Sequence, residues 1–159
     1  MPTIYVLAGL PGHGKSFVSS YLAEKTGAEH INVDKVRNEI TDGDPQYTQS
    51  ESAETYDTLI ERGKTVYDSG SSVILDGTFN IVSGRDRVKD IGGDDVVFIR
   101  IECDEETAKE RLANRNGISD ADPSVYDKFR FMPIQYDSVT IDNSGSKDET
   151  KKQIRQKIL

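Results

Sequence analysis

The sequence predicts an α/β protein in three layers, with a five-stranded parallel sheet between helices on both faces. Short apolar runs alternate with stretches of helical periodicity along the 159 residues, an arrangement typical of βαβ units. The run at 96–101 is almost continuously apolar, as in a parallel strand that is buried on both faces. A glycine-rich segment at 9–14 separates the first predicted strand from the first helix, and such sheets bind ligands at the carboxyl ends of their strands.

The predicted strands are short apolar runs bounded by polar or turn residues. Three of them end directly before an aspartate, at Asp34, at Asp76 and at Asp142. Parallel strands bring their carboxyl ends to one edge of a sheet, so we expect Asp34 and Asp76 at the same edge as the glycine-rich segment. The five predicted strands are residues 3–8, 28–33, 72–75, 96–101 and 138–141.

The predicted helices have apolar residues at helical spacing and recognisable ends. Val18, Tyr21 and Leu22 follow the i, i+3, i+4 pattern. Gly27 is expected to end this helix, and Asp34 is expected to cap the next one. The predicted helices are residues 16–26, 34–40, 49–69, 81–91, 104–116, 123–131 and 148–159.

Composition narrows the class of protein. The length is that of one domain, without a linker or repeat, so we expect residues 1–159 to form a single domain. A net charge of -8 argues against non-specific binding to nucleic acid, which needs a basic surface. Cys103 is the one cysteine, which excludes an intramolecular disulfide and suits a reducing cytosol. No signal peptide or membrane-spanning run is recognisable, so we expect a cytoplasmic protein, a monomer or dimer without an obligate protein partner.

Residues 9–16 are Gly-Leu-Pro-Gly-His-Gly-Lys-Ser. They fit the P-loop (Walker A) pattern of Gly, four free positions, Gly, Lys and Ser or Thr. Glycines let backbone N–H groups surround phosphate oxygens, and the following helix directs its positive end at the same anion. Lys15 is expected to reach the β- and γ-phosphates, and the Ser16 hydroxyl to ligate Mg²⁺. The alternative is a chance match in a glycine-rich turn. The candidate nucleotide-binding residues of this segment are Gly9, Pro11, Gly12, His13, Gly14, Lys15, Ser16 and Phe17.

Asp34 and Arg37 follow the second predicted strand, one helical turn apart. A carboxylate beside a phosphate site could accept the proton of an attacking hydroxyl. An arginine there could bind an anionic group or hold the carboxylate. The alternative is a capping aspartate with a surface arginine.

Asp76 ends the apolar run Val-Ile-Leu-Asp. An apolar strand that ends in aspartate is the Walker B arrangement, in which the carboxylate supports Mg²⁺ or its water shell. The alternative is a turn-forming Asp-Gly pair with Gly77. Ser16 and Asp76 are thus the candidate metal ligands, and Asp34, Arg37 and Asp76 the candidate substrate-binding residues.

Arg111 and Arg115 are four residues apart at the end of a predicted helix. Two arginines beside a loop suit a short lid, at approximately 111–125, that closes over the phosphoryl group. Glu–Arg pairs on a solvated helix, involving Glu106 and Glu110, are the alternative. His13 occupies a free position of the P-loop, where we expect its backbone to matter more than its ring. We expect His30 to be structural, and the arginines Arg85, Arg87 and Arg130 to be charges on solvated faces.

The ordered set of motifs resembles small P-loop kinases of the nucleotide-kinase-like group. The likeness is to the AAA-type predicted-kinase family, to polynucleotide 5′-kinases and to zeta-toxin-like kinases. It spans roughly residues 3–145. The matching segments are Gly-Leu-Pro-Gly-His-Gly-Lys-Ser at 9–16, Asn-Val-Asp-Lys-Val-Arg at 32–37, Val-Ile-Leu-Asp-Gly-Thr-Phe-Asn at 73–80, Glu-Arg-Leu-Ala-Asn-Arg at 110–115 and Ser-Asp-Ala-Asp-Pro-Ser-Val at 119–125.

The resemblance implies a three-layer P-loop fold and ATP-dependent transfer of the γ-phosphoryl group to a hydroxyl. The acceptor would be a small molecule or a nucleotide or polynucleotide 5′ end. It implies that Asp34 is the general base and that Arg37 contacts a phosphate of the substrate. It also implies that Lys15, Arg111 and Arg115 act on the phosphates, and that the loop at 142–145 lies near the base of ATP. The sequence departs from this family pattern in two ways: it lacks a phosphatase half, and its acidic charge fits a nucleic-acid substrate poorly. The resemblance therefore predicts the type of reaction better than it predicts the substrate.

A second function stays open at this point. An acceptor-independent NTPase or a nucleotide-dependent switch would also use Lys15, Ser16, Asp76 and Mg²⁺. A GTPase would need the guanine-binding pattern Asn-Lys-x-Asp, which the sequence does not contain.

Overall fold

The computed structural model describes residues 1–10, 13–113 and 131–159. Several predictions lie outside these ranges: the roles of Pro11, Gly12, Arg115 and Arg130, the short helix at 123–131, and all of the lid beyond the first residues at 111–113.

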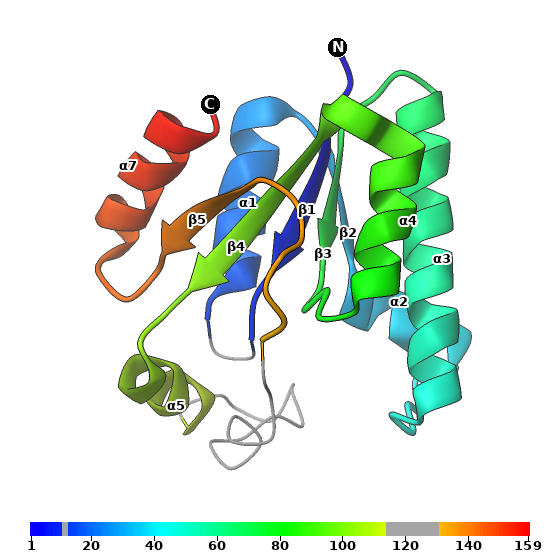
Figure 1. Cartoon of the computed structure of the whole chain (residues 1–159). Helices are drawn as coiled ribbons and strands as arrows, with labels where there is room; N and C mark the ends of the chain where they lie inside the picture. The colour runs from blue at the N-terminus through cyan, green and yellow to red at the C-terminus, as the bar shows by residue number, and fades with distance from the viewer. Residues whose placement is uncertain (11–12, 114–130) are drawn as a thin grey trace.

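The sheet contains five strands in the order β2-β3-β1-β4-β5, and all four neighbouring pairs are parallel. The prediction of a five-stranded parallel sheet is therefore confirmed. The arrowheads of β1, β4 and β5 in Figure 1 mark the edge of the sheet at which the parallel strands end. The strands are β1 Ile4–Ala8, β2 Glu29–Asn32, β3 Val73–Asp76, β4 Val96–Glu102 and β5 Ser138–Asp142.

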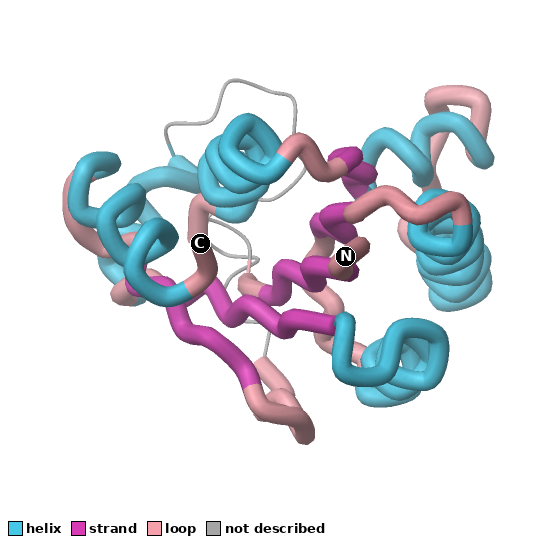
Figure 2. Tube along the Cα trace, turned by 90° about the horizontal axis from the view of Figure 1, so that it is seen from above, coloured by secondary structure: helices cyan, strands magenta, loops and turns pink. Residues whose placement is uncertain are grey.

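The helices flank this sheet on both sides, as Figure 2 shows along the strands. A 3₁₀ turn, Gly93–Asp95, leads from α4 into β4. Of the described helices, none combines the length and apolar character needed to span a bilayer. Their bounds are α1 Lys15–Thr26, α2 Val33–Ile40, α3 Gln49–Asp68, α4 Val82–Gly92, α5 Glu105–Ala113 and α7 Lys147–Lys157.

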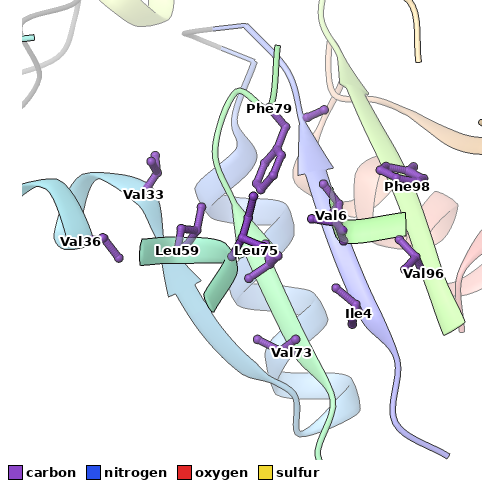
Figure 3. Close-up of a cluster of buried hydrophobic side chains, with 13 residues drawn as sticks. Ile4, Val6, Val33, Val36, Leu59, Val73, Leu75, Phe79, Val96 and Phe98 are labelled. Atoms are coloured by element: carbon purple, nitrogen blue, oxygen red, sulfur yellow. The ribbon is translucent and has the colours of Figure 1, made fainter. Parts of the chain in front are cut away.

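Alternation of side chains along the strands creates two apolar cores. On one face, side chains of β1, β3 and β4 pack against α2, α3 and α4 (Figure 3). On the other face, the alternate side chains of the same strands and of β5 pack against α1 and α7. The first core includes Ile4, Val6, Leu59, Leu75, Phe79, Val88 and Phe98, and the second includes Leu7, Val18, Leu22, Ile74, Ile99, Ile141 and Ile154.

Helix ends show where local prediction succeeded and where it failed. Gly27 ends α1 with φ 73° and donates its N–H to Ala23 O, as predicted. The prediction that Asp34 caps α2 is wrong. The Asn32 side chain accepts the N–H groups of Asp34 and Lys35 instead. Because Asn32 caps the helix, Asp34 lies in the first turn, where its carboxylate remains free for another role.

The prediction of a solvated Arg85 is also wrong. Arg85 is 0% exposed. Its Nε donates to Phe79 O at 2.7 Å, and its Nη1 donates to Pro133 O at 3.0 Å. It therefore ties the segment after β3 to the chain that leads into β5. Arg87 is exposed and pairs with Asp57 and Glu61, as a solvated arginine should.

Candidate nucleotide and acceptor site

The carboxyl ends of the strands carry most of the predicted site residues. The glycine-rich loop follows β1, Asp34 follows β2, and Asp76 is the last residue of β3. The loop at 142–145 begins at the end of β5. The topology thus places these segments along a single edge, the lower one in Figure 1.

At two positions of the P-loop, neighbouring atoms lie so close to the backbone that only glycine fits. Gly14 has φ 82° and ψ 32° and precedes the first turn of α1. A Cβ on Gly14 would lie 2.0 Å from Nδ2 of Asn143. A Cβ on Gly9 would lie 2.9 Å from Ile101 O. The loop therefore fits against β4 and the end of β5 only without these side chains.

The side chains at the start of α1 have contrasting surroundings. Lys15 folds back over the loop, and its Nζ donates to Gly9 O at 2.8 Å and to Leu10 O at 3.3 Å. Ser16 is exposed at the first turn. Phe17 is partly buried, and Lys147 Nζ lies 5.6 Å from its ring centroid. The exposed hydroxyl of Ser16 is thus accessible to a ligand, whereas Phe17 contributes packing.

Asn143 connects the P-loop to the last strand and helix. Its Nδ2 donates to His13 O at 2.8 Å, and its Oδ1 accepts from the hydroxyl of Thr150 at 2.6 Å. Its main-chain N–H donates to Glu102 O at 2.7 Å. The residue is buried. One residue therefore fixes the P-loop relative to β4 and α7, through its main chain and its side chain, a role that sequence reasoning missed.

Arg111 lies over the P-loop. Its Nη2 donates to Asn143 O at 2.7 Å, and Nη1 lies 3.4 Å from Cys103 Sγ. Nη1 is also 3.5 Å from the position of a Cβ on Gly14. Within the described residues Arg111 makes no ion pair with Glu106 or Glu110, so the alternative of a solvated Glu–Arg pair does not describe it.

The ring of His13 is part of the structure of the loop. Nδ1 lies 2.9 Å from Ile101 O, and the residue is buried. Burial lowers the pKa of His13, and the positive charges of Lys15, Arg100 and Arg111 act in the same direction. The hydrogen bond to Ile101 opposes this shift without cancelling it. The ring is therefore a neutral anchor of the loop, although the sequence predicted that the backbone of His13 would matter more than its ring.

Asp76 is a buried carboxylate that is held ionised. Its Oδ2 accepts from His30 Nε2 at 2.8 Å, from Ser19 Oγ at 3.0 Å and from Asn32 Nδ2 at 3.1 Å. Burial alone would raise the pKa of Asp76, but the hydrogen bond from His30 and the charge of Lys15 outweigh it and hold the pKa below its ordinary value. The alternative of a simple turn-forming aspartate does not describe Asp76, because three hydrogen-bond donors from other elements hold its carboxylate in place.

Arg37 is not a surface arginine. It is 9% exposed, and its Nη1 donates to Glu51 Oε2 at 3.1 Å and to Ser52 Oγ at 3.2 Å. Its Nε is buried without a hydrogen-bond partner, which costs about 1–3 kcal/mol for an ordinary polar group. Asp34, one turn earlier, is exposed. The two residues form an open carboxylate next to a buried cation.

The segment after Asp76 has a strained backbone that two side chains hold. Phe79 has φ 44°, a left-handed conformation rare for bulky residues. The buried hydroxyl of Tyr56 accepts the N–H groups of Thr78 at 3.1 Å and of Phe79 at 3.3 Å. Arg85 binds the Phe79 carbonyl from the other side. No local sequence pattern predicts this arrangement, because Tyr56 and Thr78 are 22 residues apart.

A hollow of about 400 Å³ opens beside the P-loop, at the ends of β4 and β5. Leu10 and His13 line it from the loop, and Cys103 and Ser144 line it from the strand ends. It adjoins the loop at 142–145, where the family resemblance places the base of ATP.

Comparisons with known proteins identify the family and the fold of this chain. A family model described as an AAA domain matches residues 4–131. Among curated proteins, an uncharacterized protein of Mycobacterium tuberculosis, Rv2004c, is 26% identical over 161 residues that cover 91% of this chain. A Mycobacterium bovis protein, Mb2027c, matches to the same extent. The chain spans 32% of the length of these relatives.

Three solved structures have the same fold. A sugar kinase from Janibacter sp. HTCC2649 superposes with a TM-score of 0.77 at 19% identity, covering 99% of this chain and 95% of its own. A gluconokinase from Sinorhizobium meliloti 1021 has a TM-score of 0.75 at 20% identity, covering 96% and 89%. The Mycobacterium tuberculosis APS kinase CysC, solved with AMPPNP and APS, has a TM-score of 0.71 at 16% identity, covering 98% and 96%. At these identities the comparisons show the P-loop kinase fold.

Proposed function

The chain belongs to the AAA-domain family whose model spans most of it, and from this premise we propose that it is an ATP-dependent kinase acting on a hydroxyl of a small molecule. The main observation behind the proposal is that two groups of residues lie at the same edge of the sheet. Lys15, Gly14 and Arg111 form a phosphate-binding group, and Asp34 with Arg37 forms an acceptor group. Asp76 lies between the two groups. Its carboxylate accepts a hydrogen bond from Asn32 at the start of α2, and the positive charge of Lys15 lowers its pKa.

On the donor side, the backbone N–H groups of the P-loop and the N-terminus of α1 bind the phosphates. Lys15 Nζ, which donates to two loop carbonyls here, would donate to β- and γ-phosphate oxygens in their place. Arg111, fixed over Gly14, would stabilise the charge that develops on the transferring group. Arg115, four residues on, is proposed for the same task from the lid.

The donor set fits Mg²⁺. The exposed hydroxyl of Ser16 and the ionised carboxylate of Asp76 are oxygen ligands of the kind that this ion prefers. These two residues would hold the ion or its water shell. Bound with ATP, Mg²⁺ supplies neutralisation of phosphate charge.

On the acceptor side, Asp34 would take the proton of the attacking hydroxyl. The hydroxyl oxygen forms a bond to the γ-phosphorus, and the bond from that phosphorus to the β–γ bridging oxygen breaks. ADP leaves with the bonding pair, and the proton stays on the Asp34 carboxylate. The names of the structural neighbours, a sugar kinase, a gluconokinase and an APS kinase, support a small hydroxyl-bearing acceptor rather than the end of a polynucleotide. We also propose that residues 1–159 act as one cytoplasmic domain with a lid near 111–125.

The test is phosphate transfer from γ-labelled ATP with Mg²⁺ to a panel of sugars, nucleosides, hydroxylated antibiotics and 5′-hydroxyl oligonucleotides. A labelled product that disappears with Lys15→Ala is the expected result. Release of free phosphate at a rate that no acceptor changes would instead establish an NTPase or a switch.

Asp34→Asn tests the general base. We expect kcat to fall by about 10²-fold or more while KM for ATP stays nearly constant, because the base acts on the acceptor and not on the nucleotide. Glu39→Gln is the matched control, since Glu39 is an exposed carboxylate on the same helix and pairs with Arg62 at 2.6 Å. Equal turnover in the two variants would remove Asp34 from this role.

A further inference from the structure

Tyr47 stands out in the loop that joins α2 to α3. It is 54% exposed although its ring is large and partly apolar. Its φ of 56° is a left-handed conformation that bulky residues rarely adopt. Such conformations persist only where the surroundings impose them, and they concentrate at ligand-binding sites.

Glu51 imposes this conformation. Its Oε2 accepts the N–H of Tyr47 at 2.7 Å, and its Oε1 accepts the N–H of Gln46 at 2.8 Å. The N–H of Gln46, with that of Tyr47 and the guanidinium of Arg37, holds the pKa of Glu51 below its ordinary value. One ionised carboxylate thus fixes the loop and faces Arg37 at the same time.

The buried side chain of Arg37 packs against the ring of Tyr47. Its guanidinium carbon lies 5.0 Å from the centroid of the Tyr47 ring. The result is an ordered stack of an arginine and an aromatic ring, one helical turn from the exposed carboxylate of Asp34. An exposed ring that is held rigid loses little freedom when a second ring or a sugar face packs on it.

The charges around this stack do not favour an anion. The ion pair with Glu51 compensates the positive charge of Arg37, and both side chains are 11% exposed. Asp34 adds a negative charge nearby. Lys35, the lysine of α2, lines a separate hollow along β2 with Glu39 and Arg62. A phosphate at this position would meet two carboxylates and an arginine that is already paired.

We propose that Tyr47 and the Arg37–Glu51 pair form an acceptor subsite for an uncharged, hydroxyl-bearing ring, such as a free sugar or the sugar of a nucleoside. The ring packs on Tyr47, its hydroxyls bond to Glu51 and Arg37, and one hydroxyl reaches Asp34. This inference rests on the proposed kinase activity and specifies its substrate class.

The first experiment compares uncharged sugars and nucleosides with their phosphorylated counterparts as acceptors of γ-labelled phosphate. We expect the uncharged members to have the higher kcat/KM. A preference for phosphorylated acceptors would overturn the inference and leave the kinase activity standing. Transfer to no member of the panel, with ATP still bound, would overturn the proposed function and the inference with it.

The second experiment uses variants of the subsite. Tyr47→Ala should raise KM for the uncharged acceptor about tenfold, with kcat and KM for ATP changed less than about twofold. Tyr47→Phe, which keeps the ring, should recover most of this loss. Glu51→Gln, which leaves Arg37 uncompensated, should move the kcat/KM ratio towards phosphorylated acceptors. An unchanged acceptor KM in Tyr47→Ala would overturn the inference.

Discussion

The two sides of the candidate site are constructed in different ways. On the donor side the left-handed backbone position belongs to a glycine, Gly14, which adopts it without strain. On the acceptor side, the described residues that have positive φ and are not glycine are Asp42, Tyr47 and Phe79. Each such position costs about 1–3 kcal/mol, and Glu51 and Tyr56 provide the hydrogen bonds that hold two of them.

This difference shows which side can be recognised from local sequence. A phosphate cradle made of main-chain atoms depends on glycines at fixed spacing. A subsite made of side chains from α2, α3 and the segment after β3 depends on contacts between distant residues. The same difference determines how each side should respond to mutation.

The largest effect is expected from Gly14→Ala. A Cβ would lie 2.0 Å from Asn143 Nδ2 and would force an L residue to φ 82°. The loop and the Asn143–Arg111 contacts must then shift, so we expect ATP to bind at least about 10²-fold more weakly. Calorimetric titration with a non-hydrolysable ATP analogue measures this loss.

Gly27→Ala is the matched control at the other end of α1. Its φ is 73°, but a Cβ there would meet nothing within 4 Å. We expect about 1–2 kcal/mol of lost stability from backbone strain and unchanged ATP affinity. If both variants lost affinity equally, the close packing of the P-loop against Asn143 would not be what sustains nucleotide binding.

A smaller effect is expected on the acceptor side from Tyr56→Phe. The variant keeps the ring, which packs on Phe79 at a centroid distance of 5.1 Å. It leaves the N–H groups of Thr78 and Phe79 without their acceptor. We expect the free energy of unfolding to fall by about 1–3 kcal/mol, with KM for the acceptor raised more than KM for ATP.

Tyr67→Phe is the control on the same helix. The Tyr67 hydroxyl donates to Asp95 at 2.6 Å, and the partly exposed Asp95 carboxylate can bond to water when that hydroxyl is removed. Its loss should cost less than about 1 kcal/mol and leave both KM values unchanged. Chemical denaturation and steady-state kinetics of the two variants would decide whether Tyr56 supports the acceptor side specifically.

The fold, and the position of the glycine-rich loop between β1 and α1, were largely predictable. The five short strands, the glycine that ends α1 and the aspartate at the end of β3 all follow from patterns within a few residues. These patterns are local because backbone geometry and periodicity act over one or two turns.

The supporting contacts were not predictable, for a physical reason. Asn143 is 130 residues from the carbonyl that it binds in the P-loop. Arg85 was expected on a solvated face because its neighbours in sequence are polar, yet its acceptors are carbonyls 6 and 48 residues away. Arg37 and Glu51 are 14 residues apart. Such pairs leave no periodic signal, and only the assembled sheet brings them together.

The smallest effect expected is a pH dependence that begins on the donor side. Burial lowers the pKa of His13 from an ordinary value of 6.5, so the folded protein favours the neutral ring. The unfolded chain takes up its proton first as the pH falls. The stability that His13 contributes is thus complete above about pH 6.5 and is lost below it, until the folded ring also takes up a proton.

His13→Asn tests this dependence, because the asparagine amide can still donate towards Ile101 O. Between about pH 7.5 and about pH 5.5 the wild-type protein should lose more unfolding free energy than the variant. Glu51 on the acceptor side, with its lowered pKa, should add losses only at lower pH. Denaturant unfolding at several pH values measures both slopes. Parallel slopes would mean that the pKa of His13 is the same in the folded and the unfolded protein, and that the donor side does not respond to pH before the acceptor side does.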